Sequence, residues 1–155
     1  MPETLRFCAD VHLGKLARLL RMFGFDTSYK NDFSKEDLYE IALNENRVLL
    51  SKSDYFSRFT DINFYQVKSA DPLQQLKDII DHFELRNSFN PFIRCLYCNA
   101  ILEKTEKEEV KNQLLPNTKN DFSEFWKCPS CKKIYWKGSH YERMMKIIHD
   151  LESGL

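Results

Sequence analysis

The sequence lacks three features: a net charge, a long apolar run and an N-terminal signal segment. Its 23 basic and 23 acidic side chains cancel, so any nucleic-acid binding must come from a local patch rather than an overall basic field. No apolar run approaches the roughly 20 residues of a membrane span, and no basic stretch precedes an apolar one at the N-terminus. We therefore expect a cytoplasmic globular protein that makes no membrane contact and whose thiols stay reduced.

The sequence has five cysteines, and four of them occur in two short motifs, RCLYCN at 94–99 and KCPSCK at 127–132. Four thiolates at this spacing close a tetrahedral Zn²⁺ site with Zn–S distances of about 2.3 Å. Two short-loop disulfides fit the spacing less well. The pattern predicts a structural zinc ribbon with the ligands Cys95, Cys98, Cys128 and Cys131. The fifth, Cys8, is interpreted as a small buried apolar residue.

Strand and helix patterns alternate through the first 85 residues or so. Short strands are expected at 5–9, 26–29, 47–51 and 64–67, and helices are expected to begin near residues 13, 34 and 71. This alternation predicts an α/β fold with a parallel sheet, whose ligands gather at the carboxyl ends of the strands. We expect an α/β domain at 1–88 and a zinc-ribbon domain at 89–155 that ends in a helix over 141–151.

Several acids could gather at the carboxyl edge of that sheet. Asp10 and the segment 51–54 each follow a strand, and further acids precede or begin the second helix. Clustered carboxylates are the ligands that Mg²⁺ and Mn²⁺ prefer in metal-dependent nucleases. Asp32 and Glu36 have a competing interpretation as turn and helix-start acids that the helix dipole favours. The candidate catalytic residues are Asp10, Asp54, Glu36 and Asp37.

Basic and aromatic side chains recur in two places, along the first helix and around the cysteine motifs. Cations that meet phosphates beside aromatics that stack on bases are typical of single-strand binding surfaces. The alternatives are a solvated helix face and, for the tryptophans, the small core of the ribbon. The candidate RNA-binding residues are Lys15, Arg18, Arg21, Arg94, Trp126, Lys132, Lys133, Trp136, Lys137 and His140.

Both ends of the chain carry motifs of one known family. The segments FCADVHLGKLAR at 7–18, LRMFGFD at 20–26, PFIRCLYCN at 91–99 and YWKGSHY at 135–141 occur in the expected order. In these segments the chain resembles the Mut-seven C-terminal RNase domain family, and the resemblance covers nearly its whole length. It implies a PIN-like nuclease domain followed by a small zinc ribbon with four cysteine ligands, and RNA as the partner. It names no protein partner.

The family has three catalytic acids; by this resemblance the chain keeps one of them and differs at the other two positions. Asp10 stands at the family's first acid, whereas Lys35 and Ser53 stand where the family has the other two. An acid follows immediately in each case, as Glu36 and Asp54. One interpretation is a metal-dependent ribonuclease that hydrolyses RNA with Mg²⁺ or Mn²⁺ held by shifted acids. The alternative is a catalytically degenerate protein that acts as a non-enzymatic RNA-binding or protein-interaction adaptor. We take the first as the expectation.

Overall fold

A parallel four-stranded sheet organises the first part of the chain in the computed structural model, which describes residues 4–154. The strands run in the order β2-β1-β3-β4, and every neighbouring pair is parallel. Their bounds are Phe7–Ala9 for β1, Thr27–Ser28 for β2, Val48–Ser51 for β3 and Asn63–Gln66 for β4. The expected α/β class and parallel sheet are confirmed.

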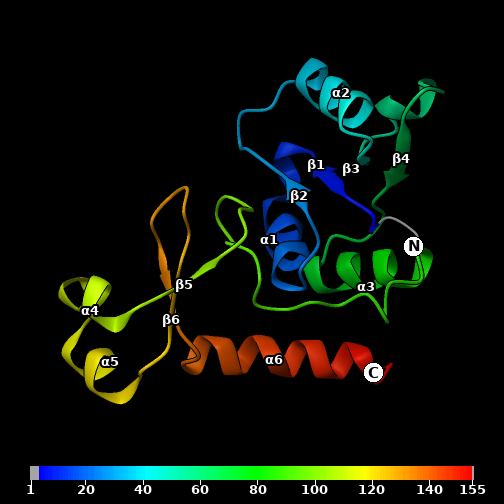
Figure 1. Cartoon of the computed structure of the whole chain (residues 1–155). Helices are drawn as coiled ribbons and strands as arrows, with labels where there is room; N and C mark the ends of the chain where they lie inside the picture. The colour runs from blue at the N-terminus through cyan, green and yellow to red at the C-terminus, as the bar shows by residue number, and fades with distance from the viewer. Residues whose placement is uncertain (1–3, 155) are drawn as a thin grey trace.

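Helices cover both faces of this sheet (Figure 1). Their bounds are Gly14–Met22 for α1, Lys35–Asn44 for α2 and Pro72–His82 for α3, and the short 3-10 helices η1 and η2 span Val11–Leu13 and Tyr55–Arg58. Phe7 and Ala9 belong to the hydrophobic cluster of α1 and α3, whereas Cys8 belongs to that of α2. Alternate residues of a strand point to opposite faces, so one three-residue strand supplies both cores.

Local signals fix where the helices begin and end. Ser34 and Asp37 form the reciprocal capping box of α2, with hydrogen bonds of 2.9 and 3.0 Å, and the Asp71 carboxylate caps α3 by accepting from Gln74 N–H. Gly24, at φ 95°, follows the end of α1. A Cβ at this position would lie 2.1 Å from the Asn90 carbonyl oxygen, so only glycine fits here.

The cysteine module is an antiparallel three-stranded sheet in the order β5-β6-β7. Its strands span Glu103–Thr105, Phe125–Lys127 and Ile134–Tyr135. The insert between the first two of them contains α4 (Lys107–Val110), η3 (Lys111–Gln113) and α5 (Pro116–Asp121). None of the helices within residues 4–154 is long and apolar enough to cross a membrane.

The last helix, α6 (Ser139–Glu152), returns from the cysteine module to the first part of the chain (Figure 1). Met144, Ile148 and Leu151 belong to the same hydrophobic cluster as α1 and α3. The connecting segment 85–92 is also packed, since Phe89 lies edge-on to Phe23 at 4.8 Å. The division at residue 88 stays a prediction, and the two parts that it separates share one core.

Candidate metal centre and nucleic-acid interface

The sulfurs of Cys95, Cys98, Cys128 and Cys131 converge, all lying within 4.8 Å of one another. The Sγ–Sγ distances are 3.6 Å between Cys95 and Cys131 and 3.1 Å between Cys98 and Cys128. A tetrahedral zinc with four sulfur ligands needs sulfurs about 3.8 Å apart. The donor set therefore fits Zn²⁺, and its four cysteines leave no open position for a reacting water.

The two cysteine motifs adopt the same turn. In each, the residue after the second cysteine has positive φ, 72° at Asn99 and 68° at Lys132. Its backbone N–H donates to the carbonyl oxygen of the first cysteine, at 2.9 Å to Cys95 and 3.0 Å to Cys128. This left-handed residue closes the turn so that both sulfurs face the same point. Asparagine tolerates the conformation better than lysine does.

Tyr135 supports the cluster from outside the set of metal ligands. Its hydroxyl accepts from Leu96 N–H at 3.2 Å and lies 3.1 Å from the sulfur of Cys95. Burial opposes ionisation of Cys95, but the hydrogen bond from Tyr135 and nearby backbone N–H groups outweigh it and lower the pKa to about 7. Burial and the neighbouring thiols raise the pKa of Cys98 to about 12. The arrangement favours a thiolate at Cys95, the form that binds metal.

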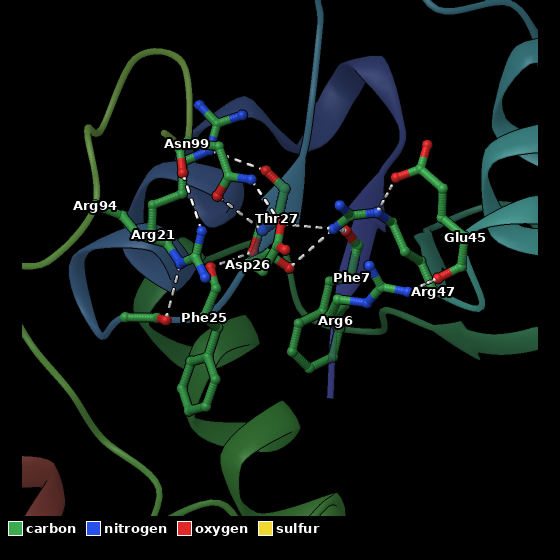
Figure 2. Close-up of polar contacts among 11 residues, drawn as sticks. Arg6, Phe7, Arg21, Phe25, Asp26, Thr27, Glu45, Arg47, Arg94 and Asn99 are labelled. Atoms are coloured by element: carbon green, nitrogen blue, oxygen red, sulfur yellow. Dashed lines mark hydrogen bonds and ion pairs between the residues drawn. The ribbon is translucent and has the colours of Figure 1, made fainter. Parts of the chain in front are cut away.

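A partly buried polar joint ties the first cysteine turn to the amino end of the parallel sheet (Figure 2). The side chain of Asn99 accepts from Thr27 N–H at 3.0 Å and donates to the Asp26 carboxylate at 2.6 Å. Asp26 also pairs with Arg47 at 2.8 Å. Burial works against ionisation of Asp26, but these hydrogen bonds and the positive charges of Arg47 and Arg94 lower its pKa. The joint therefore rests on an ionised Asp26.

Two of the predicted RNA-binding arginines belong to this joint. Arg21 is 4% exposed and donates to the carbonyl oxygens of Thr27 and Leu96, both at 3.0 Å. Arg94 donates to the carbonyl oxygens of Gly24 and Asn99, both at 3.1 Å. Their guanidinium groups bind the protein's own backbone, so their placement gives no support to contacts with RNA.

Five other predicted RNA-binding residues line one groove between α1 and the cysteine module. Its volume is about 560 Å³, and its lining contains no carboxylate. Tyr97, whose side chain is 53% exposed, lies in this groove with the Arg18 guanidinium 4.8 Å and the Lys133 ammonium 4.0 Å from its ring centre. The predicted residues brought together here are Arg18, Lys132, Lys133, Trp136 and His140.

Trp126 and Lys137 lie outside this groove. The ring of Trp126 packs edge-on against Phe92 at 4.9 Å, and the Lys137 ammonium lies 5.4 Å from its centre. Trp126 also contacts the cluster of Cys95, Leu102 and Cys128. Trp126 is therefore part of the small core of the ribbon, which was the alternative interpretation of the tryptophans in the sequence.

Asp10 lies at the carboxyl end of β1 and is held by two donors. Its Oδ2 accepts from the Ser51 hydroxyl at 2.7 Å, and its Oδ1 accepts from His12 N–H at 3.4 Å. Ser51 Oγ in turn accepts from Ser53 N–H at 3.2 Å. Ser51, the last residue of β3, thus contacts Asp10 through its hydroxyl, and Ser53 contacts Ser51 through its backbone N–H.

The other candidate acids do not gather at Asp10. Asp37 is held in its capping box, Glu36 is exposed on α2, and Asp54 is exposed at the start of η2. The Lys35 ammonium lies 4.1 Å from the ring centre of Tyr55 rather than beside Asp10. Across residues 4–154, the cysteine quartet alone brings three or more potential metal ligands together. The catalytic roles of these acids stay a prediction.

The sequence interpretation missed the residues of the joint. Asp26 reads as a strand residue and Asn99 as part of a cysteine turn, and 73 positions separate them. One available signal was the asparagine directly after the second cysteine, a position that favours the left-handed conformation. Lys15, by contrast, was expected near Asp10 and lines a second cavity there together with His12 and Lys52.

Comparison with known proteins gives one match. The comparison with curated proteins finds none, and the comparison with solved structures finds none either. The model of the Mut7-C RNase domain matches residues 5–148, which include the parallel sheet, the four cysteines and most of α6. The chain therefore belongs to the Mut7-C RNase domain family.

Proposed function

We propose that this protein is a ribonuclease-like, RNA-binding protein that holds single-stranded RNA in the groove between α1 and the cysteine module. The proposal is carried by the composition of that groove, where Arg18, Lys132 and Lys133 surround aromatic side chains and no carboxylate intrudes. Membership of an RNase domain family supports RNA as the ligand.

Single strands suit this groove better than duplexes because their bases are free to stack. Tyr97 and Trp136 offer aromatic faces, and stacking on such a residue contributes about 1–3 kcal/mol per base. With a formal net charge of zero, the protein has little long-range attraction for nucleic acid, so affinity must come from the groove itself.

The test is fluorescence anisotropy with a labelled single-stranded RNA at several salt concentrations. Three phosphate contacts predict a slope of about −2 in a plot of log affinity against log salt. Tyr97→Ala should weaken binding about 5- to 100-fold through lost stacking. Lys133→Gln should reduce both the affinity and the slope. Lys146→Gln, on the exposed side of α6, is the matched control. Unchanged affinity in both groove variants would exclude this groove.

Hydrolysis of RNA is the second candidate, favoured by the position of Asp10 at the carboxyl end of β1. Mg²⁺ or Mn²⁺ supplies charge neutralisation and an activated water when such a centre is assembled. In the described geometry the acids do not form that centre, so Asp54, Glu36 or Asp37 would have to move toward Asp10. Asp10→Asn should abolish Mn²⁺-dependent cleavage. Equal cleavage by the variant and the native protein would exclude this acid.

A further inference from the structure

The first cysteine turn, 95–99, is fixed by the part of the chain that contains the parallel sheet. The carbonyl oxygen of Leu96 accepts from Arg21, and the side chain of Asn99 accepts from Thr27 N–H, both at 3.0 Å (Figure 2). Leu96 is also buried in the hydrophobic cluster of α1 and α3. These contacts do not involve the metal, so the first turn should keep its conformation when zinc is absent.

The second turn, 128–132, differs in its support. Within residues 4–154, its hydrogen bonds stay inside the cysteine module, among them the 3.0 Å bond from Lys132 N–H to the Cys128 carbonyl oxygen. Residues 129–133 are all exposed. Lys132 also has a φ of 68°, a left-handed conformation that is unfavourable for lysine. Bonds from zinc to the two sulfurs of this turn offset these weaknesses, so its order should depend on the metal.

The proposed RNA groove takes residues from both turns. Tyr97 lies between the two ligands of the first turn, whereas Lys132 and Lys133 follow Cys131 in the second. The Lys133 ammonium lies 4.0 Å from the ring centre of Tyr97. A metal bound to both turns fixes this spacing, because metal–sulfur bonds of about 2.3 Å leave the turns little room to separate. The basic side of the groove should therefore loosen when the metal leaves.

Contacts beyond the turns keep the cysteine module attached to the rest of the chain. The Tyr135 hydroxyl in β7 accepts from Leu96 N–H at 3.2 Å, and α6, which follows β7, packs into the cluster of α1 and α3. Loss of the metal should thus free the second turn without detaching the module. We propose that zinc occupancy regulates RNA binding in the groove, because the second turn is ordered by the metal and the first by the protein itself. The inference rests on the proposed function. Linkage then requires RNA to tighten zinc binding by the same factor by which zinc tightens RNA binding.

The first experiment compares the exchange rates of two equivalent amide hydrogens in the full chain, with zinc bound and after its removal by a chelator. Asn99 N–H and Lys132 N–H close the two turns in the same way, at 2.9 and 3.0 Å, so each is the control for the other. Removing zinc should speed exchange at Lys132 at least about tenfold and leave exchange at Asn99 within about twofold. Adding zinc back should reverse the change. Equal acceleration at both amides, or loss of protection at the amides of β3, would overturn the inference.

The second experiment measures the affinity of the same two forms for labelled single-stranded RNA. Zinc removal should weaken binding at least about tenfold, because two of the three cations of the groove, Lys132 and Lys133, belong to or adjoin the second turn. RNA should raise the zinc affinity, measured by competition with the chelator, by the same factor. Equal RNA affinity with and without zinc, while Tyr97→Ala still weakens binding, overturns the inference and leaves the proposed function standing. Absence of RNA binding by the zinc-loaded protein overturns the proposed function, and the regulatory link falls with it.

Discussion

The hydroxyl of Ser51 donates a 2.7 Å hydrogen bond to the carboxylate of Asp10, joining the carboxyl ends of β3 and β1. The backbone pairs there as well, because Asp10 N–H donates to the Leu50 carbonyl oxygen at 2.9 Å. The acid that the family resemblance singles out is therefore held by its own sheet.

Ser51→Ala should destabilise the protein by about 1 kcal/mol, because it removes the hydroxyl donor from a partly buried carboxylate. Urea unfolding of the variant measures this loss. Ser88→Ala, at an exposed serine of the connecting segment, should stay within about 0.5 kcal/mol of the native protein. Equal losses in the two variants would contradict a role for the Ser51–Asp10 bond.

Restoring acids at two positions should create a metal site beside Asp10. The Ser53 backbone N–H donates to Ser51 Oγ, which in turn bonds to Asp10, so position 53 lies close to Asp10, and Lys35→Asp exchanges the ammonium that lies against Tyr55 for a carboxylate. We expect the double variant Lys35→Asp, Ser53→Asp to bind Mn²⁺ more tightly than the native protein does, as measured by calorimetry. Adding Asp10→Asn should abolish the gain. No gain in the double variant would argue against this geometry.

Removing one cysteine of the quartet should release the bound metal. Cys98→Ser should lower the zinc content from about one ion per chain towards zero, as measured by a colorimetric chelator assay. Cys8→Ala is the control, since Cys8 is buried in the core beside α2 and should leave the zinc in place. Retention of zinc by Cys98→Ser would rule out this ligand set.

Zinc affinity should rise with pH. Burial and neighbouring thiols raise the pKa of Cys98 to about 12, and its proton must leave when the metal binds. Proton release can be measured by calorimetry in two buffers of different ionisation enthalpy. Binding enthalpies that do not depend on the buffer would contradict coupled deprotonation.

The left-handed residues of the two cysteine turns offer a matched pair of substitutions. Asn99→Gly keeps the backbone conformation but loses the hydrogen bonds to Asp26 and Thr27, so it should destabilise the protein by about 1–3 kcal/mol. Lys132→Gly relieves a positive φ and loses only the exposed side-chain hydrogen bond to the Pro129 carbonyl oxygen, so it should be neutral or stabilising by up to about 1 kcal/mol. Thermal unfolding distinguishes the two variants. Similar losses of stability in both would contradict a stabilising role for the hydrogen bonds of Asn99.

Asp26 should make the protein sensitive to acid. Its pKa is lowered in the folded state, so its contribution to stability is complete above the unfolded value of about 3.9 and is lost as pH falls through the folded value. Asp26→Asn should destabilise the protein by about 1.5–3 kcal/mol at pH 7 and by less near pH 3. Denaturant midpoints at both pH values measure this, with the exposed Asp121→Asn as control. A loss of stability in Asp26→Asn that is the same at both pH values would argue against an ionised Asp26 in the folded state.

The elements of the fold were predictable because their signals are local. The pairs Ser34–Asp37 and Asp71–Gln74 lie within one helical turn, and β3 is a continuous apolar run. The cysteine spacing likewise predicted the metal site. The hydrogen bond between Asp26 and Asn99 was not predictable, because nothing in the sequence around either residue indicates a partner 73 positions away. The candidate acids show the same limit, because sequence spacing does not say where an exposed side chain points.

The return of α6 to the first part of the chain affects how the protein is made. Met144, Ile148 and Leu151 complete the cluster around α1 and α3, yet they leave the ribosome long after those helices. During synthesis, the growing chain carries an uncovered apolar face that can associate with other chains. Contacts between distant segments also form slowly. The parallel sheet should therefore reach its full stability only after residue 151 has left the ribosome.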